Sequence, residues 1–371
     1  MPSLFPVTEI DTRVYEQELR DFLPSRMVDI HTHVWLDKFA AKEEEKVKRA
    51  VTWPALVAAE SPIEGLLETY RLMFPGKEVT PLIFSSLKRG DDAEEQNHYV
   101  AECTARYGVP SLLYAFPEWS AEDLLWRILR GRHLGIKVYL NLSPAYLPEK
   151  EIRIFDFIPH HQLELLNSRK MILMLHVPRD GRLGDPVNLA QMLEIEERYP
   201  DLNVIYAHIG RAYCPEDFGK AFELLRRTRK LVMDFSANTL DEAMYRVLDA
   251  IGPNRVLFGS DLPILRMRMR RICEKGRYVN LVPKGMYGDV SKDPNMREVA
   301  EAESRDMTFF MYEELRAFKR AAARLGLGKS DIEAVFHGTA RALIDRVGLE
   351  LYGRAFMPTA AVSATATGDR I

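Results

Sequence analysis

Residues 27–33 read M-V-D-I-H-T-H, an apolar run that closes on two histidines. Side chains two apart on a strand share a face, so His31 and His33 are predicted to point the same way. Two neutral imidazoles on one face make half of a divalent-metal site, although such pairs also occur by chance in strands. Three later apolar runs each end in a histidine or an aspartate, at His176, His208 and Asp261. Together the four endings predict one shared site.

Short apolar runs alternate with longer segments of helical apolar spacing along the chain. The eight runs cover residues 27–35, 79–86, 109–117, 135–141, 171–178, 203–210, 230–237 and 256–262. Each run is too apolar to be half solvated, which predicts a parallel sheet covered by helices. Eight such strands can close into a barrel, whose reactive residues lie at the C-terminal strand ends. The histidine and aspartate endings fall there, so we predict an α/β fold, a (β/α)8 TIM barrel.

Several segments exceed a minimal barrel and define the predicted domain organisation. Residues 1–26 form an N-terminal extension with a short helix that stops near Pro24. The catalytic barrel is predicted over 27–352, with insertions at 36–78 and 262–305, after strands 1 and 8. Long insertions after barrel strands usually build the mouth of the pocket. A small, polar C-terminal tail is predicted over 353–371.

Composition limits the possible partners and the compartment. The 371 residues are 47% hydrophobic with a formal net charge of -3, and no basic domain suggests a nucleic-acid partner. The N-terminus is charged where a signal peptide needs apolar residues, and no run reaches the ~18–20 apolar residues of a membrane span. The three cysteines lack C-x-x-C spacing, which argues against a disulfide scaffold and fits a reducing compartment. We therefore expect a soluble, cytoplasmic protein without a membrane partner, and the insertions are compatible with a homo-oligomer.

The predicted ligands indicate the chemistry. Three neutral imidazoles and one carboxylate (His31, His33, His176 and Asp261) suit Zn²⁺, with Mn²⁺, Fe²⁺ or Co²⁺ as other occupants. Such a metal polarises a carbonyl and lowers the pKa of bound water from ~15.7 toward ~7. Asp261 is predicted to act as both ligand and proton shuttle, and His208 to donate to the oxyanion. The alternative for any one histidine is a hydrogen-bonded core residue, but five candidates at one rim disfavour it.

Four motifs resemble one enzyme family. V-D-I-H-T-H (28–33), M-L-H-V-P (174–178), Y-A-H-I-G (206–210) and F-G-S-D-L-P (258–263) look like the strand 1, 5, 6 and 8 motifs of the amidohydrolase superfamily. The chain is most similar to the amidohydrolase 2 branch, which includes aminocarboxymuconate-semialdehyde decarboxylase. F-H-G-T-A-R-A-L (336–343) looks like that branch's closing G-N-A-A-R-L, with Thr339 in place of Asn. The resemblance implies a (β/α)8 barrel with a divalent metal but leaves the reaction open, because the branch contains hydrolases, lactonases, hydratases and decarboxylases.

Lys137 leaves the number of metals open. It resembles the lysine that becomes carboxylated and bridges two metals in phosphotriesterase-like members, in which case His176 and His208 could hold a second ion. One-metal relatives also carry a basic residue there, and we favour a single metal, most simply Zn²⁺ or Mn²⁺. A buried lysine must be paired or neutralised in either case.

Candidate substrate contacts surround the predicted rim. They are Trp35, Tyr139, Arg211 and Arg266. Trp35 could wall a planar substrate or simply cap the mouth. Arg266, Arg268, Arg270 and Arg271 follow Asp261, and a guanidinium near the mouth suits bidentate carboxylate recognition. The alternative is a solvated face of the insertion or a link between subunits.

Two reaction classes fit these residues. The first is a metal-dependent hydrolase acting on an amide, lactone or ester carbonyl of a small, carboxylate-bearing substrate. The second is a non-oxidative decarboxylase of an unsaturated or aromatic acid, in which Asp261 or His208 delivers a proton to carbon. The complete His-x-His pair favours hydrolysis, and the arginines favour a carboxylate substrate. A catalytically inactive binding barrel is disfavoured, because every predicted ligand position is filled.

Overall fold

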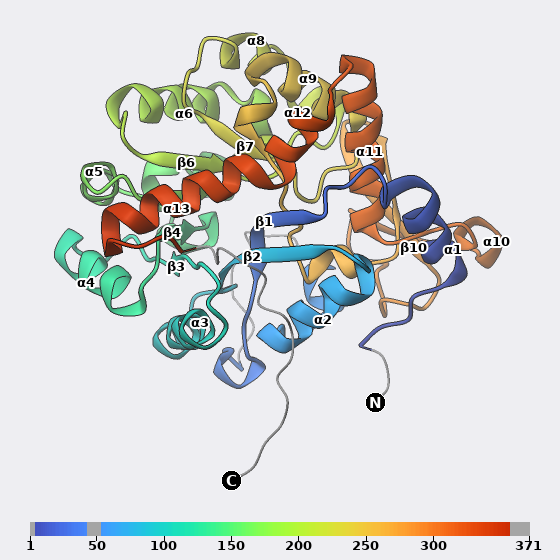
Figure 1. The fold of residues 1–371 in the computed structure, drawn as a ribbon, viewed down its shortest axis with the longest axis horizontal. Coiled ribbons are helices and arrows are strands. Elements are labelled where there is room, and N and C mark those ends of the chain that lie inside the picture. Colours follow the sequence, from blue (N-terminus) through green and yellow to red (C-terminus); the bar gives the residue numbers. More distant parts are fainter. Residues whose placement is uncertain (1–3, 43–52, 357–371) are drawn as a thin grey trace.

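The computed structural model describes residues 4–42 and 53–356 (Figure 1). Part of the first insertion and most of the predicted C-terminal tail, from residue 357 onward, lie outside the described residues. Each helix within the described part of the chain is too short or too polar for a membrane span.

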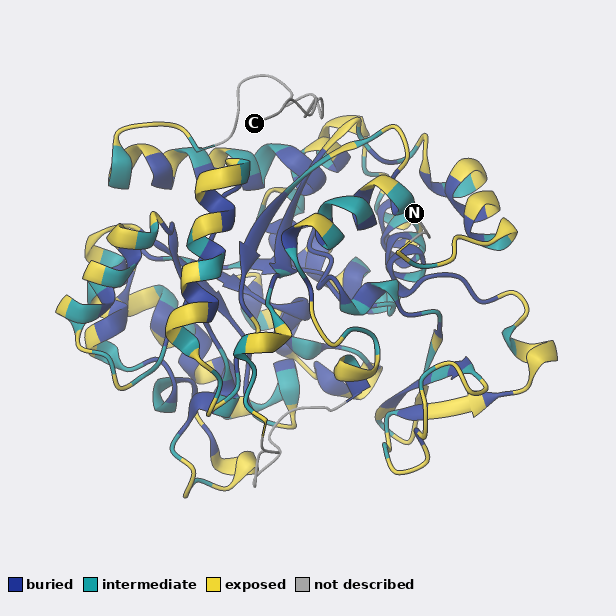
Figure 2. Cartoon of the chain, turned by 90° about the horizontal axis from the view of Figure 1, so that it is seen from below, coloured by how far each residue is buried: buried dark blue, intermediate teal, exposed yellow. Residues whose placement is uncertain are grey.

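Eight parallel strands form the centre of the molecule. They are β1 (Arg26–His33), β2 (Glu78–Phe84), β3 (Leu113–Tyr114), β4 (Gly135–Val138), β5 (Ile172–Leu175), β6 (Asn203–Tyr206), β7 (Val232–Asp234) and β8 (Val256–Leu257). β1 pairs with β2, and β3 to β8 form a six-stranded sheet in sequence order. Each strand lies within its predicted run or begins one residue before it. The central strands are buried (Figure 2), as their continuous apolar runs predicted.

Backbone hydrogen bonds outside the named strands join the two sheets into a ring. Ile83 connects β2 to the approach of β3, because its N–H donates to Pro110 (3.0 Å) and its carbonyl accepts from Leu112 (2.9 Å). At the other seam, Ile30 N–H donates to Phe258 (3.0 Å). The segment after β8 therefore lies beside β1, and the predicted (β/α)8 barrel is confirmed.

Helices alternate with the strands and cover the barrel. Those after β2 to β7 are α3 (Ala93–Tyr107), α4 (Ala121–Gly131), α5 (His160–Ser168), α6 (Pro186–Arg198), α7 (His208–Arg211), α8 (Ala221–Leu225) and α9 (Asp241–Ile251). Capping side chains begin three of them: Asp92 accepts from Glu95 N–H, Ser120 from Asp123 N–H, and Asp185 from Val187 N–H. The buried face of α4 carries Leu124 and Ile128, as its apolar spacing predicted.

The last helices close the far end of the barrel. They are α11 (Phe310–Leu325), α12 (Lys329–Glu333) and α13 (Thr339–Tyr352). Apolar residues of α13 pack against the barrel interior around Val28 and Ile172. Arg346 donates to Asn203 at the start of β6 (2.8 Å), and Tyr352 donates to the His133 carbonyl just before β4 (2.6 Å). α13 thus covers the N-terminal strand ends and leaves the C-terminal ends free for a site.

Segments outside the barrel add further structure. The N-terminal extension contains the predicted helix, α1 (Glu9–Val14), which continues as a π-helix over Tyr15–Leu19, and the first insertion contains α2 (Ile63–Met73). The second insertion forms an unpredicted three-stranded sheet, β9 (Arg270–Glu274), β10 (Arg277–Pro283) and β11 (Met296–Val299), and then α10 (Glu301–Ser304). β9 and β10 are an antiparallel pair. This sheet lies to one side of the barrel (Figure 1).

A buried ion pair docks the N-terminal extension on the second insertion. Arg268 donates to both oxygens of Asp11, at 2.9 and 2.5 Å. Thr308 also donates to Asp11 (2.7 Å), and Thr8 caps the same carboxylate. The Asp11 side chain is fully buried, so its charge is balanced entirely by these neighbours.

The prediction that the cysteines are unpaired is wrong for two of them. Cys214 and Cys273 form a disulfide, while Cys103 is free and buried. The partners are 59 residues apart, because β7, α9 and β8 intervene between them. Local spacing therefore gave no signal for a bond that ties the loop after β6 to β9.

Candidate active site

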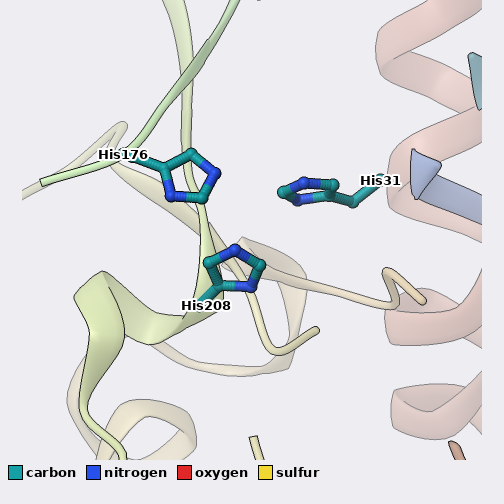
Figure 3. A group of neighbouring side chains, drawn as sticks. All are labelled: His31, His176 and His208. Atoms are coloured by element: carbon teal, nitrogen blue, oxygen red, sulfur yellow. The ribbon is translucent and has the colours of Figure 1, made fainter. Parts of the chain in front are cut away.

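The C-terminal strand ends bring the predicted histidines together. His31 lies on β1, His176 follows β5, and His208 follows β6. Their rings converge on one point (Figure 3), with centroids 5.8 Å apart for His31–His176, 4.9 Å for His31–His208 and 4.6 Å for His176–His208. One nitrogen from each ring lies within 4.8 Å of the others, so the three could hold a metal ion.

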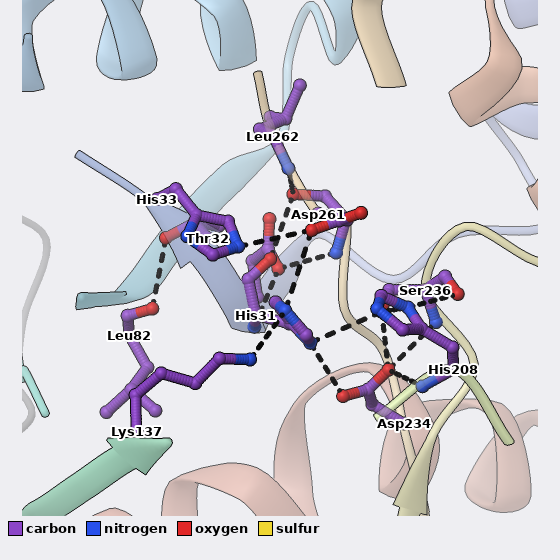
Figure 4. Close-up of polar contacts among 12 residues, drawn as sticks. His31, Thr32, His33, Leu82, Lys137, His208, Asp234, Ser236, Asp261 and Leu262 are labelled. Carbon is purple, nitrogen blue, oxygen red and sulfur yellow. Dashed lines mark hydrogen bonds and ion pairs between the residues drawn. The ribbon is translucent and has the colours of Figure 1, made fainter. Parts of the chain in front are cut away.

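A second group shares His31. It contains His33 and Asp261, and its ligand atoms also lie within 4.8 Å of one another. The Asp261 Oδ1 atom is 3.2 Å from His33 Nε2 and 3.5 Å from His31 Nε2 (Figure 4). The four predicted ligands thus divide between two overlapping groups. His31, His33 and Asp261 form one group, and His176 joins His31 in the other. The third member of that second group is His208, which was predicted as the oxyanion donor and not as a ligand.

Hydrogen bonds at Nδ1 orient three of the imidazoles. His31 Nδ1 contacts the Asp234 carboxylate (2.9 Å), and His33 Nδ1 contacts the Ser85 carbonyl (3.1 Å). His208 Nδ1 contacts the Ser236 carbonyl at 2.9 Å. Acceptors at these positions hold the proton on Nδ1, which leaves the Nε2 lone pair directed into the site. A donor set of oriented, neutral imidazoles with one carboxylate fits a divalent metal such as zinc.

Asp234 is a site residue that the sequence analysis missed. Besides contacting His31, its carboxylate accepts from the backbone N–H of His208 (2.9 Å) and of Ser236 (3.1 Å). Burial raises the pKa of Asp234, but the nearby His31 and His208 and the hydrogen bonds from the His31 and Ser236 side chains hold it below its ordinary value. The run 230–237 ends V-M-D-F-S, so an acid at the C-terminal end of a predicted strand was the available signal.

The charges at the centre follow from burial and from these contacts. Burial, together with the nearby Lys137 ammonium, lowers the pKa of His31 to about 3, so this imidazole is neutral. Burial raises the pKa of Asp261, but its contact with His33 and the other nearby histidines outweigh burial and hold the pKa at about 2. The centre therefore combines the neutral imidazole of His31 with the ionised carboxylate of Asp261, the protonation states that metal binding needs.

Lys137 enters the site from β4. Its buried Nζ is 3.4 Å from His31 Nε2 and lies 4.8 Å from the centroid of the Phe84 ring. Burial lowers the pKa of Lys137 to about 7, so a substantial fraction is a neutral amine at neutral pH. This placement is compatible with either expectation from the sequence, a bridging carboxylated lysine or a charge beside a single metal.

Unusual backbone conformations aim two of the site residues. His208 (φ 57°) and Asp261 (φ 52°) both adopt the left-handed region. Such conformations cost of order 1–3 kcal/mol in a non-glycine residue and concentrate at functional sites. Gly259 permits the close packing behind them, because a Cβ at this position would lie 2.8 Å from His31 Cβ. The glycine of the F-G-S-D motif is therefore required where β1 and the end of β8 meet.

The predicted substrate contacts occupy different places around this centre. The Tyr139 ring is 4.6 Å from the His176 ring, and Arg211 donates to the Pro178 carbonyl at 3.1 Å. The Trp35 indole donates to the Ala59 carbonyl (2.9 Å), so the first insertion holds it. Arg266 lies over the Phe5 ring of the N-terminal extension, 5.7 Å from its centroid. Tyr139 and Arg211 thus border the histidines, whereas the other two contact the added segments.

A comparison with protein families gives a match over most of the chain. The amidohydrolase model Amidohydro_2 matches residues 28–346 of the 371. The chain belongs to the amidohydrolase family. It is thus a member of a family of metal-dependent enzymes, and the histidine groups are a candidate for the family's metal site. Comparison with curated proteins gave no match.

Solved structures with the same fold include enzymes of several reaction types. A Pseudomonas putida protein described as a 2-pyrone-4,6-dicarboxylic acid hydrolase is 15% identical, with a TM-score of 0.51 over 86% of this chain and 98% of its own. A 4-oxalomesaconate hydratase from Rhodopseudomonas palustris is 16% identical (TM-score 0.50, 88% and 96%). A 2,6-dihydroxybenzoate decarboxylase from Rhizobium is 13% identical (TM-score 0.52, 86% and 98%). At these identities the likeness shows the fold and leaves the reaction unresolved.

Proposed function

We propose that this amidohydrolase is a metal-dependent hydrolase that cleaves an amide, lactone or ester bond in a small, carboxylate-bearing substrate. His31, His33, His176 and Asp261 would hold one divalent metal, most simply Zn²⁺ or Mn²⁺. When bound, such a metal polarises a carbonyl and makes water a nucleophile at neutral pH. The observation that carries the proposal is that Asp234 and two backbone carbonyls hold the Nδ1 atoms of three imidazoles, while the Asp261 carboxylate lies beside Nε2 of His31 and His33.

Two side chains would move protons in this reaction. Asp261, an ionised carboxylate beside His33, would accept the proton of the attacking water and pass it to the leaving group. His208 presents Nε2 as its free nitrogen, because Nδ1 is held by the Ser236 carbonyl. Once protonated at Nε2, His208 would donate a hydrogen bond to the carbonyl oxygen as charge develops there.

The borders of the site would position the substrate. Tyr139 packs edge-on against His176, and Arg211 is held at the end of β5 by two backbone carbonyls. We assign these two residues to substrate contact, with Trp35 and Arg266 as further contacts from the added segments. The guanidinium of Arg211 would recognise the substrate carboxylate.

Decarboxylation is the second candidate, favoured by the basic groups around the site. Lys137 lies against His31, and Arg211 borders His176 through the loop after β5. These cations could bind a carboxylate that is lost as carbon dioxide as well as one that only anchors the substrate. Similar folds occur in decarboxylases as well as in hydrolases, consistent with either reaction. In this case Asp261 or His208 would deliver a proton to the carbon that loses carbon dioxide.

One assay separates the two reactions. The metal-loaded protein is incubated in ¹⁸O-labelled water with carboxylate-bearing lactones, esters and amides, and separately with unsaturated and aromatic acids. Hydrolysis places one ¹⁸O atom in the product, whereas decarboxylation releases carbon dioxide without net water uptake. Turnover should depend on His176, so His176→Ala should lose metal and activity together. Full metal content and full turnover in that variant would refute the ligand assignment.

A further inference from the structure

The second insertion places an arginine beside the proposed active site without a carboxylate partner. Arg271, on β9, is partly buried, and no carboxylate among the described residues lies within ion-pair distance of it. Arg268, three residues earlier, has two hydrogen bonds to Asp11. A partly buried cation gains most from an anionic partner, because the surrounding protein screens its charge poorly. The contrast suggests that the partner of Arg271 is a ligand.

Aromatic rings fix the orientation of the Arg271 guanidinium. Its central carbon lies 4.4 Å from the Tyr278 ring centroid, 4.5 Å from Phe310 and 4.9 Å from Tyr213. Arg271 Nε donates to Asn280 Oδ1 (2.9 Å), and Nη1 donates to the Ala237 carbonyl (2.5 Å). These contacts use two of the five N–H donors, so others stay available in a preorganised position.

Tyr213 connects this arginine to the catalytic histidines. Its ring is 5.1 Å from Tyr278 on one side and 6.3 Å from His208 on the other, measured between centroids. The Cys214–Cys273 disulfide joins the residue after Tyr213 to β9, two residues beyond Arg271. The disulfide therefore links the loop that carries His208 to the strand that carries Arg271. The Tyr213 ring lies between these two side chains.

Glu314, on α11, is a buried acid that acts on the charge of Arg271 but forms no ion pair with it. Burial raises the pKa of Glu314 well above its ordinary value, which favours its neutral form. Glu314 therefore does not take the place of a carboxylate hydrogen-bonded to the Arg271 guanidinium.

We infer that Arg271, with Tyr213 beside it and Arg211 on the same loop as Tyr213, is the specificity determinant that binds a carboxylate of the substrate away from the bond that reacts. This inference rests on the proposed function for the position of the reacting carbonyl, near His208 and Asp261. The substrate class is then a small acid whose carboxylate and scissile group are separated by about the width of the Tyr213 ring, which lies between Arg271 and His208. Arg271 contacts substrate in this assignment but takes no part in proton transfer.

The test measures binding of simple probes to the metal-loaded protein at neutral pH. Isophthalate and its uncharged analogue isophthalamide are titrated by calorimetry into the wild type, Arg271→Gln, Arg271→Lys and Arg270→Gln. Arg270 is the matched control, because it lies on the same strand with an exposed side chain. Thermal melting of each variant monitors the fold, and Arg271→Lys keeps the charge if Arg271→Gln does not fold.

Wild type and Arg270→Gln should both prefer isophthalate over isophthalamide. Arg271→Gln should lose about 10- to 100-fold of that preference, the range expected for charge-assisted hydrogen bonds, and Arg271→Lys should fall between. Three results would overturn the inference. The wild type could show no preference for isophthalate, Arg271→Gln or Arg271→Lys could keep the wild-type preference, or the variants could bind both probes equally more weakly. Because binding needs no turnover, loss of the preference would stand even if no hydrolysis were found, and a retained preference would leave the hydrolase proposal intact.

Discussion

Two of the buried clusters of charged side chains in the described part of the chain differ in kind, one around Asp11 and one around His31. In the first, Arg268, Thr308 and Thr8 saturate the carboxylate with hydrogen bonds. In the second, Asp234 orients His31 through Nδ1, while Nε2 faces Asp261 (3.5 Å) and Lys137 (3.4 Å) at the centre of the site. Both clusters remove charge from water, but only the first is complete within the chain. A closed cluster stabilises structure, whereas an open one is organised around a ligand.

Removing the residue shared by both metal groups should have the largest effect. His31→Ala takes one ligand from each group, so bound metal and activity should fall together by about 100-fold or more, exceeding the 10–100-fold typical of outer partners. Elemental analysis and turnover of the same sample measure this. The exposed His98 on α3, changed to alanine, is the control. A His31→Ala protein with wild-type metal content would mean that the open cluster is not a metal site.

Breaking the closed cluster should change stability and leave the metal in place. Asp11→Asn leaves Arg268 partly buried without its charge partner, so the free energy of unfolding should fall by about 3 kcal/mol. Denaturant unfolding measures this loss, and metal content should match the wild type. A loss of metal with unchanged stability would reverse the roles we assign to the two clusters.

The closed cluster also predicts a pH dependence. Burial raises the pKa of Asp11, but the hydrogen bonds from Arg268, Thr308 and Thr8 together bring it below the ordinary 3.8. The folded protein thus favours the ionised form, and this stabilisation is present above pH 3.8 and lost as pH falls through the folded pKa. The stability difference between wild type and Asp11→Asn should therefore be constant near neutral pH and shrink below about pH 4. A difference independent of pH down to pH 2 would contradict the ion-pair explanation.

Removing the carboxylate that orients His31 in the open cluster should have an intermediate effect. Asp234→Asn keeps the shape of the side chain but removes the charge that holds the His31 ring and its tautomer, so metal affinity should weaken about 10- to 100-fold. Competition with a chelator measures the affinity. Asp241→Asn, at an exposed ion pair with Arg320, is the control. Equal affinity in wild type and Asp234→Asn would show that the carboxylate does not orient the ligand.

Opening the disulfide should have the smallest effect on the site. Replacing Cys273 with serine frees β9 from the loop that carries His208, so KM should rise by less than about tenfold, or 1.4 kcal/mol, with kcat nearly unchanged. The unpaired Cys103, changed to alanine, is the control. A large fall in kcat without a change in KM would mean that the disulfide positions the catalytic residues and not the substrate contacts.

The central residues of the open cluster could be predicted because strands have a strong sequence signal. Continuous apolar runs marked all eight strands. A parallel barrel places the residues at the C-terminal ends of its strands on one face. His31, His176 and His208 therefore converge as the pattern indicated. Positions at the ends of strands are fixed by the backbone alone, so they needed no knowledge of side-chain contacts.

Other features depend on contacts between distant segments, which the sequence does not specify locally. In the sequence Asp234 resembles any aspartate at a strand end, and its role follows from its contact with His31, 203 residues away. The disulfide joins Cys214 to Cys273 across an intervening strand–helix–strand unit. The segment leading into β9 alternates arginine with methionine over 266–270, a pattern equally suited to a solvated loop. The division of the arginines between Asp11 and the site could likewise be read only from the fold.

Metal content per chain, measured by elemental analysis with intact mass and a crystal structure of the same sample, tests the central claim most directly. We expect one zinc or manganese per chain and an unmodified Lys137. Two metals with a carboxylated Lys137 would replace the single-metal centre with a two-metal, phosphotriesterase-like one. A protein that binds no divalent metal, even after reconstitution, would contradict the account.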